Sequence, residues 1–171
     1  MKNITFEKYQ GNGNDFVIID SRGNDLYKNY KTNKIFDIKK ICNRQFGIGA
    51  DGVIFIEEPN EDNYAKMIIF NSDGSEAQMC GNGIRCLVEY LHVNDSMNNK
   101  NIEYKIETKA GLKIAKYIND EITVKMGVPI LESQNIPTTI EKKFNSIPSH
   151  EFIEKNFKYI GYAVGMGNPH L

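Results

Sequence analysis

A helix that is apolar on nearly every side constrains the fold of this chain most strongly. Its apolar residues recur at helical spacing; they are Ile84, Cys86, Leu87, Val88, Tyr90, Leu91 and Val93. Only a narrow polar stripe remains, formed by Arg85, Glu89 and His92, in which Arg85 and Glu89 can pair four residues apart. A helix with this pattern is buried, so the rest of the chain has to supply a surface that surrounds it.

The residues just before this helix place a thiol at its N-terminus. Cys80 is followed by the small and polar residues 81–83 and preceded by a polar turn. The unpaired N–H groups and the dipole of a helix N-terminus favour an anion, and a thiolate is such an anion. Cys80 is therefore a candidate for chemistry, although a buried structural thiol is the alternative for this residue taken alone. Cys42 and Cys86 are expected to be structural core thiols.

Composition excludes several classes of protein. The net charge of the 171 residues is −1 and the lysines are scattered, which argues against nucleic acid as a partner. There is no apolar run near 18 residues and no apolar signal segment near the N-terminus, so we expect a cytoplasmic protein without membrane contact. The three cysteines have no CxxC spacing, which predicts free thiols and no metal site.

Short β-rich runs surround the predicted helix. The expected strands cover residues 3–9, 15–20, 53–57, 64–70, 102–108, 112–114 and 122–126. Residues 11–15 form a glycine-rich loop between the first two, and the last three alternate as a meander. A short helix is expected at residues 37–45 with Asp37 as its N-cap. These elements predict an α+β fold in which a curled mixed or antiparallel sheet wraps around one central buried helix.

A domain boundary is expected near residues 127–129, where proline-marked sequence begins. Residues 1–127 then form a first lobe with Cys80 and the central helix, and residues 128–171 begin a second, similar lobe that is incomplete. Within the second part we expect a helix at 149–156 and a strand at 158–164.

A short internal repeat supports the idea of a second lobe. The element G-x-G-N occurs at residues 11–14 and again at residues 165–168, each time after a short β-rich run. A repeat of four residues is a weak signal. It leads us to interpret the chain as the N-terminal portion of a longer protein.

Five motifs in order along the chain together resemble those of diaminopimelate epimerase. They are residues 13–16, 47–52, 70–75, 80–86 and 167–170. The resemblance implies a cofactor-free isomerase that interconverts LL- and meso-diaminopimelate, in the biosynthesis of lysine and peptidoglycan precursors. It also implies two similar lobes, each a sheet around a central helix, with the small-molecule substrate in the cleft between them. A homodimer of the full-length protein is left open.

The resemblance also implies roles for individual residues. Cys80 matches one of two cysteines that flank the substrate α-carbon, one removing a proton and the other returning one; the partner cysteine belongs to the second lobe. His170 resembles a histidine that adjusts the protonation of the cysteines. Gly52 stands where some members carry a substrate-binding glutamine, so that contact is dropped or passes to the backbone. The implied substrate-binding residues are Asn14, Asn71, Gly81, Asn82 and Asn168.

Several alternatives stay open at this point. Asn14 and Asn71 are also typical of residues that only stabilise turns, and His92 is better interpreted as a packed or solvated side chain than as a catalyst. The function can also be that of a two-lobed relative, such as proline racemase or the isomerase of phenazine biosynthesis, or that of a non-catalytic binding module. The 171 residues alone are expected to be inactive, because the second cysteine is absent.

Overall fold

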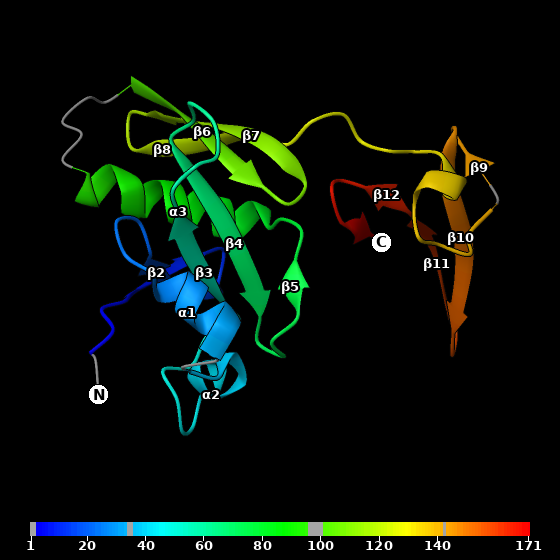
Figure 1. Cartoon of the computed structure of the whole chain (residues 1–171). Helices are drawn as coiled ribbons and strands as arrows, with labels where there is room; N and C mark the ends of the chain where they lie inside the picture. Colours follow the sequence, from blue (N-terminus) through cyan, green and yellow to red (C-terminus); the bar gives the residue numbers. More distant parts are fainter. Residues whose placement is uncertain (1–2, 34–35, 96–100, 142) are drawn as a thin grey trace. The chain divides into compact units, whose positions relative to one another are not determined.

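The computed structural model describes residues 3–33, 36–95, 101–141 and 143–171 (Figure 1). The chain divides into two compact units, Met1–Lys125 and Met126–Leu171. The division falls close to the predicted boundary, while the interpretation of the second unit as the start of a similar lobe stays a prediction. Among the described residues, no helix is long and apolar enough to cross a membrane.

The first unit is built on an eight-stranded mixed sheet with the strand order β1-β2-β3-β4-β6-β7-β8, in which β5 pairs with β4. The pairs β2–β3 and β4–β6 are parallel, and the remaining pairs are antiparallel. The predicted strands are found here, although the first begins at residue 7 rather than 3. The strands are β1 (Glu7–Gly11), β2 (Asn14–Asp20), β3 (Gly52–Glu57), β4 (Ala65–Asn71), β5 (Glu76–Ala77), β6 (Asn101–Thr108), β7 (Gly111–Ile118) and β8 (Glu121–Lys125).

The sheet curls around the helix α3 (Gly81–Asn94), which crosses behind β3 and β4 in Figure 1. This helix contacts strands at both ends of the sheet as well as in its centre, namely β1, β2, β3, β4, β7 and β8. Its side chains Ile84, Leu87, Val88 and Leu91 are fully buried. The predicted central helix and the predicted α+β class with a curled mixed sheet are therefore confirmed.

Two details of the predicted helix were wrong. Val93 is 58% exposed, because it follows Glu89 by four residues and so lies on the polar side of α3, away from the sheet. Arg85 is not seen paired with Glu89; its Nη2 atom donates a hydrogen bond to Oδ1 of Asn82 at 2.6 Å. The Asn82 side chain, one turn earlier, offers the guanidinium a closer acceptor at the start of the helix.

The opposite face of the sheet carries a second core, covered by the helices α1 (Leu26–Asn33) and α2 (Ile38–Cys42). Alternate residues of the central strands point to this face, and the residues between them point to α3. Both faces are thus covered, which explains why these strands are apolar without interruption. The buried members of this core are Val17, Ile19, Ile38, Cys42, Ala50, Val53, Phe55, Ile68 and Phe70.

The two small helices differ in how well the sequence predicted them. In α2, Asp37 is the N-cap as predicted, and its Oδ1 accepts a hydrogen bond from the N–H of Lys39 at 2.9 Å. The helix ends at Cys42 rather than 45, because Asn43 accepts hydrogen bonds from the N–H groups of the two residues that follow Arg44. Helix α1 was not predicted from the sequence. Its few apolar residues, among them Tyr27 and Tyr30, pack against Phe55.

The second unit consists of short strands and one turn of 3-10 helix. Its three-stranded sheet has the order β11-β10-β9 and its hairpin joins β12 to β13. The predicted helix at 149–156 is wrong: residues 149–154 pair with residues 157–162 in a hairpin, so pairing with the strand that follows overrides the local pattern. The strand predicted at 158–164 is found as β11, which begins and ends slightly earlier. The elements are η1 (Ser133–Asn135), β9 (Lys143–Phe144), β10 (Ile147–Glu154), β11 (Phe157–Tyr162), β12 (Val164–Gly165) and β13 (Pro169–His170).

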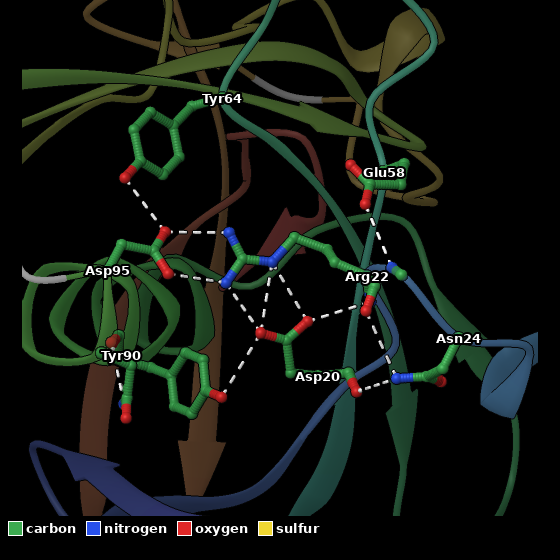
Figure 2. A network of polar contacts seen from close by, with 9 residues as sticks. Asp20, Arg22, Asn24, Glu58, Tyr64, Tyr90 and Asp95 are labelled. Atoms are coloured by element: carbon green, nitrogen blue, oxygen red, sulfur yellow. Dashed lines mark hydrogen bonds and ion pairs between the residues drawn. The ribbon is translucent and has the colours of Figure 1, made fainter.

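A cluster of polar groups ties the C-terminal end of α3 to the end of β2 (Figure 2). The guanidinium of Arg22 lies 2.7 Å from Asp20 Oδ2 and 2.8 Å from Asp95 Oδ1, the C-cap residue of α3. Tyr64 donates its hydroxyl hydrogen to Asp95, and Tyr90 donates its own to Asp20. This cluster fixes the helix at the end opposite the predicted thiol.

The variant Asp95→Asn is expected to unfold about 1–3 kcal/mol more easily at pH 7, because it removes a charged acceptor from Arg22 and Tyr64. Burial raises the pKa of Asp95, but the hydrogen bonds from Arg22 and Tyr64 outweigh burial and leave it below its ordinary value. A carboxyl group whose pKa is lower in the folded state stabilises the fold above its unfolded pKa, and the stabilisation is lost as the pH falls through the folded value.

Urea unfolding measured between pH 7 and pH 3 checks this expectation. The difference between the wild type and Asp95→Asn should shrink as the pH falls below about 4. Asp25→Asn is the matched control, since its ion pair with Lys28 is exposed and long at 3.9 Å, and should change the free energy of unfolding by less than about 0.5 kcal/mol. Equal losses in the two variants would show that the Arg22 cluster does not anchor α3.

Candidate active site at the start of the central helix

Cys80 is the N-cap residue of α3, as the sequence predicted. Its backbone is extended (φ −141°, ψ 122°), its carbonyl accepts the first helical hydrogen bond from Ile84 at 2.9 Å, and its Sγ atom accepts the N–H of Gly83 at 3.4 Å. The side chain is half-buried. The thiol therefore takes the place of the oxygen that usually caps a helix, and it stays accessible from one side.

Glycine at position 83 allows the start of the helix to lie against the sheet. A Cβ atom at this position would stand 3.1 Å from the Cδ1 atom of Ile69, 3.2 Å from that of Ile54 and 3.4 Å from Cβ of Cys80. These distances are tighter than ordinary van der Waals contact. Contact with the central strands thus fixes how close the start of α3, and with it Cys80, lies to the sheet.

A tight hairpin turn brings Asn14 to the thiol. Strands β1 and β2 are joined by Asn12 (φ 55°) and Gly13 (φ 80°), the left-handed pair that a two-residue turn requires. This turn makes Asn14 the first residue of β2, with its Oδ1 atom 3.7 Å from Cys80 Sγ and 3.4 Å from Asn82 Nδ2. Three of the predicted site residues, from segments 66 or more positions apart, therefore lie together.

Charged residues that were not predicted from the sequence lie on the far side of Asn14. Asn14 donates a hydrogen bond from Nδ2 to Asp51 Oδ2 at 2.9 Å, and the backbone N–H of Asp15 donates to the same oxygen at 3.1 Å. Arg44 bridges the two carboxylates, with Nη2 2.8 Å from Asp51 Oδ1 and 2.7 Å from Asp15 Oδ1. The hydrogen bonds from Arg44 hold the pKa of Asp15 well below its usual range; Lys8 adds to this effect and burial opposes it.

The sequence contains a signal for this contact. Asp51 directly precedes β3, and the parallel pairing of β2 with β3 sets Phe16 opposite Gly52. The residues that precede this pair, Asp15 within β2 and Asp51 before β3, must then be neighbours, and Asn14 is next to Asp15. The contact between Asn14 and Asp51 can be predicted only once it is known that β2 pairs with β3.

Asn71 and Gly52 lie opposite each other in the β3–β4 register. The Asn71 side chain donates to Ser75 Oγ at 2.9 Å, and its backbone N–H donates to the Ser75 carbonyl, so this residue stabilises a turn. A Cβ atom at position 52 would stand 2.5 Å from the carbonyl oxygen of Phe70. The local backbone therefore accepts glycine and no larger residue, which gives a physical reason why glutamine is not found there.

Asn168 and His170 belong to the second unit. The Asn168 carbonyl accepts the N–H of Met166, and it lies 2.9 Å from Nδ1 of His170, whose side chain is exposed. In the same unit His170 and His150 line a cavity of about 800 Å³. The structure places these predicted residues at the β12–β13 turn; their predicted roles stay predictions.

The remaining cysteines and His92 are packed, and all three thiols of the chain are free. Burial raises the pKa of the Cys86 thiol to about 11, and burial likewise raises the pKa of Cys42. His92 stacks on Tyr117 with ring centroids 3.6 Å apart, and its Nδ1 lies 3.0 Å from the hydroxyl of Tyr104. These side chains stabilise the fold. Cys80 is more accessible than Cys42 and Cys86.

The start of α3 can hold both an anion and a transferable proton. The N–H groups of Gly81 and Asn82 lie in the first turn, where no helical carbonyl is available to them. An anionic group of a ligand can accept from them beside the Cys80 thiol. In the part of the chain that the structure describes, no group of three or more histidine, cysteine, aspartate or glutamate side chains is placed to bind a metal ion.

Comparison with known proteins gives one family for most of the first unit. The family model of diaminopimelate epimerase matches residues 6–132. A diaminopimelate epimerase of Prochlorococcus marinus (strain NATL2A) is 49% identical over 173 residues, and one of Rippkaea orientalis is 40% identical over 168 residues. The matches cover 100% and 98% of this chain, and the chain spans about 60% of the length of these curated relatives.

Solved structures agree on the fold. A hydroxyproline epimerase from Agrobacterium vitis superposes with a TM-score of 0.60 at 13% identity, over 93% of this chain and 48% of its own. A phenazine biosynthesis protein from Bacillus anthracis superposes with a TM-score of 0.54 at 21% identity, over 96% of this chain and 55% of its own. At these identities the likeness concerns the curled sheet and its helices.

Proposed function

This chain belongs to the diaminopimelate epimerase family, an isomerase family, and on that premise we propose that it supplies one half of a cofactor-independent site that interconverts LL- and meso-diaminopimelate. The observation that carries the proposal is the half-buried Cys80 thiol at the start of α3, with Asn14 and Asn82 beside it. Inversion of an α-carbon needs a proton removed on one face and returned on the other. Cys80 is the group on one face.

The group on the other face belongs to a second lobe. Residues 128–171 are the beginning of that lobe in this proposal, and the partner thiol lies in sequence beyond the part shared with this chain. The coverage of about 60% of the curated relatives supports the idea that further residues complete the site. The 171 residues alone are accordingly expected to be inactive.

The start of α3 is suited to hold the reacting end of the substrate. As the α-proton leaves, negative charge develops on the α-carbon and the carboxylate, and the N–H groups of Gly81 and Asn82 are donors for it. Because Nδ2 of Asn14 is bound to Asp51, Asn14 meets a ligand as an acceptor through Oδ1, which suits an ammonium group. Asn71 and Asn168 are proposed contacts for the remaining polar groups, and His170 is proposed to tune the thiols.

Substrate-dependent proton exchange tests the proposal. A chimera that joins residues 1–171 to the part of the Prochlorococcus marinus relative that this chain does not match is incubated with LL-diaminopimelate in D₂O. Proton NMR should show loss of the α-proton signal and growth of the meso form. L-Proline and trans-4-hydroxy-L-proline serve as controls, and we expect no exchange with them.

Two results would contradict the proposal. A folded chimera that exchanges the α-proton of proline or hydroxyproline but not that of diaminopimelate would assign the site to another kind of racemase. Epimerisation of diaminopimelate by the 171-residue chain alone would show that no second lobe is needed.

A further inference from the structure

We propose that Asp51 is a positioning residue that fixes the Asn14 amide with its carbonyl oxygen toward Cys80, so that the thiol form of Cys80 is the hydrogen-bonded one. The catalytic meaning of this inference rests on the proposed function, whereas the geometry and its test do not. The side chains form one hydrogen-bond network that runs from Asp51 through Asn14 and Asn82 to Arg85.

The orientation of Asn14 follows from the chemistry of its partner. An ionised carboxylate only accepts hydrogen bonds, so the group that faces Asp51 Oδ2 at 2.9 Å must be the NH₂ of Asn14. The other end of the amide, Oδ1, then points to Cys80 and Asn82. Arg44 and the N–H of Asp15 hold the Asp51 carboxylate in place, so it is not free to turn away from Asn14.

At the other end of this hydrogen-bond network, the positive charge of Arg85 fixes the Asn82 amide. A guanidinium only donates, so the atom of Asn82 that lies 2.6 Å from Arg85 Nη2 must be Oδ1. The NH₂ of Asn82 then faces Asn14 Oδ1 at 3.4 Å, where it finds an acceptor. An anion at one end and a cation at the other thus determine the direction of both amides.

This direction has a consequence for the thiol. Cys80 Sγ lies 3.7 Å from Asn14 Oδ1, to which an S–H group can donate, whereas a thiolate there would face the lone pairs of a carbonyl. The N–H of Gly83 can donate to the sulfur in both states. A flip of Asn14 that offered its NH₂ to a thiolate would break the hydrogen bonds with Asp51 and Asn82.

The charged and titratable groups of this part of the site come from four segments, because Lys8 of β1 also pairs with Asp15. Asp15 lies at the start of β2, Arg44 and Asp51 lie before β3, and Arg85 and Cys86 lie on α3. Burial keeps Cys86 neutral. In the proposed reaction, a site that rests with Cys80 as a thiol uses Cys80 to return a proton, and the group on the other face removes one.

Alkylation of Cys80 as a function of pH tests the inference on the 171-residue chain, without any need for turnover. Iodoacetamide reacts with thiolates, and peptide mass mapping separates Cys80 from the two buried cysteines. In Asp51→Ala only the longer hydrogen bond from Asn82, at 3.4 Å, still opposes a turn of the Asn14 amide that offers its NH₂ to the sulfur. The pH midpoint of the reaction should move down, and the rate at pH 7 should rise about three- to tenfold.

A double-mutant cycle separates positioning from charge. Removal of the Asp51 charge also favours a nearby thiolate, but that effect does not depend on Asn14. In the Asn14→Ala background, Asp51→Ala should therefore change the rate less than about twofold if Asp51 acts through Asn14. An equal increase in both backgrounds would overturn the inference. Cys42 and Cys86 report on folding in every sample, since they should stay unmodified while the fold is intact.

A measurement on the unmutated chain covers the case in which Asp51→Ala does not fold. The side-chain NH₂ signal of Asn14 is assigned by its absence from the NMR spectrum of Asn14→Ala. We expect it to be protected from solvent exchange, because it donates to Asp51. An Asn14 signal that exchanges as fast as that of an exposed asparagine would overturn the inference. If the alkylation and NMR results are as expected but the chimera is inactive, the proposed function is contradicted and the inference about Asp51 is not.

Discussion

Replacement of Cys80 with alanine is expected to slow α-proton exchange of diaminopimelate by about 10²- to 10⁴-fold, the usual contribution of a positioned acid or base. The proposed function assigns proton transfer on one face of the α-carbon to this thiol, and no other thiol of the chain is as accessible. The measurement is the NMR exchange assay in D₂O with the chimera described above.

The matched control is Cys86→Ala in the same chimera. Cys86 lies on the same helix, but its side chain is 4% exposed and burial raises its pKa to about 11, so it is a poor acid or base at pH 7. We expect its removal to lower stability by roughly 1 kcal/mol, the typical effect of a core truncation, with little change in exchange rate. If Cys80→Ala kept the wild-type rate, or if Cys86→Ala lost as much, Cys80 would not be the proton-transfer group.

The central helix was predictable because all its signals are local. The spacing of Ile84, Leu87, Val88 and Leu91 identifies the buried face, and the small residues after Cys80 mark the start. The strands of the first unit were predictable for the same reason, since their apolar runs are short and bounded by turn residues. Two details were wrong: Val93 lies on the exposed side of the helix, and Arg85 is bonded to Asn82 rather than to Glu89.

Elements that form only through pairing or packing with another segment were not predictable. Residues 149–154 have a composition that fits a helix, and they form β10 because residues 157–162 pair with them across a tight turn. Helix α1 has too few apolar residues to show a clear pattern. It forms because its tyrosines stack on Phe55 of β3, which is a tertiary contact.

In the candidate site, too, local features could be predicted and contacts between segments could not. Cys80, Gly81 and Asn82 are adjacent in sequence, so their grouping at a helix start could be predicted. The contact of Asn14 with Asp51 joins segments 37 positions apart and depends on the parallel register of β2 with β3. Motifs drew attention to both segments, but only the register shows which side chains meet.

The variant Leu87→Ala is expected to lower the free energy of unfolding by about 2–5 kcal/mol, the largest stability effect that we predict. Leu87 has no exposed surface and lies on the central helix, which the sheet contacts from several strands. Truncation leaves a cavity that the surrounding strands cannot close, because α3 is fixed at its N-terminus by Gly83 against Ile69 and at its C-terminus by the Arg22 cluster.

Val93→Ala is the control for Leu87→Ala, because it shortens an aliphatic side chain of the same helix that is 58% exposed. Its free energy of unfolding should stay within about 0.5 kcal/mol of the wild type in urea titrations of the 171-residue chain. The loss in Leu87→Ala is a large fraction of the roughly 5–15 kcal/mol that stabilises a typical domain. Similar midpoints for the two variants would mean that the sheet does not enclose α3, and the position of Cys80 at its start would lose its structural basis.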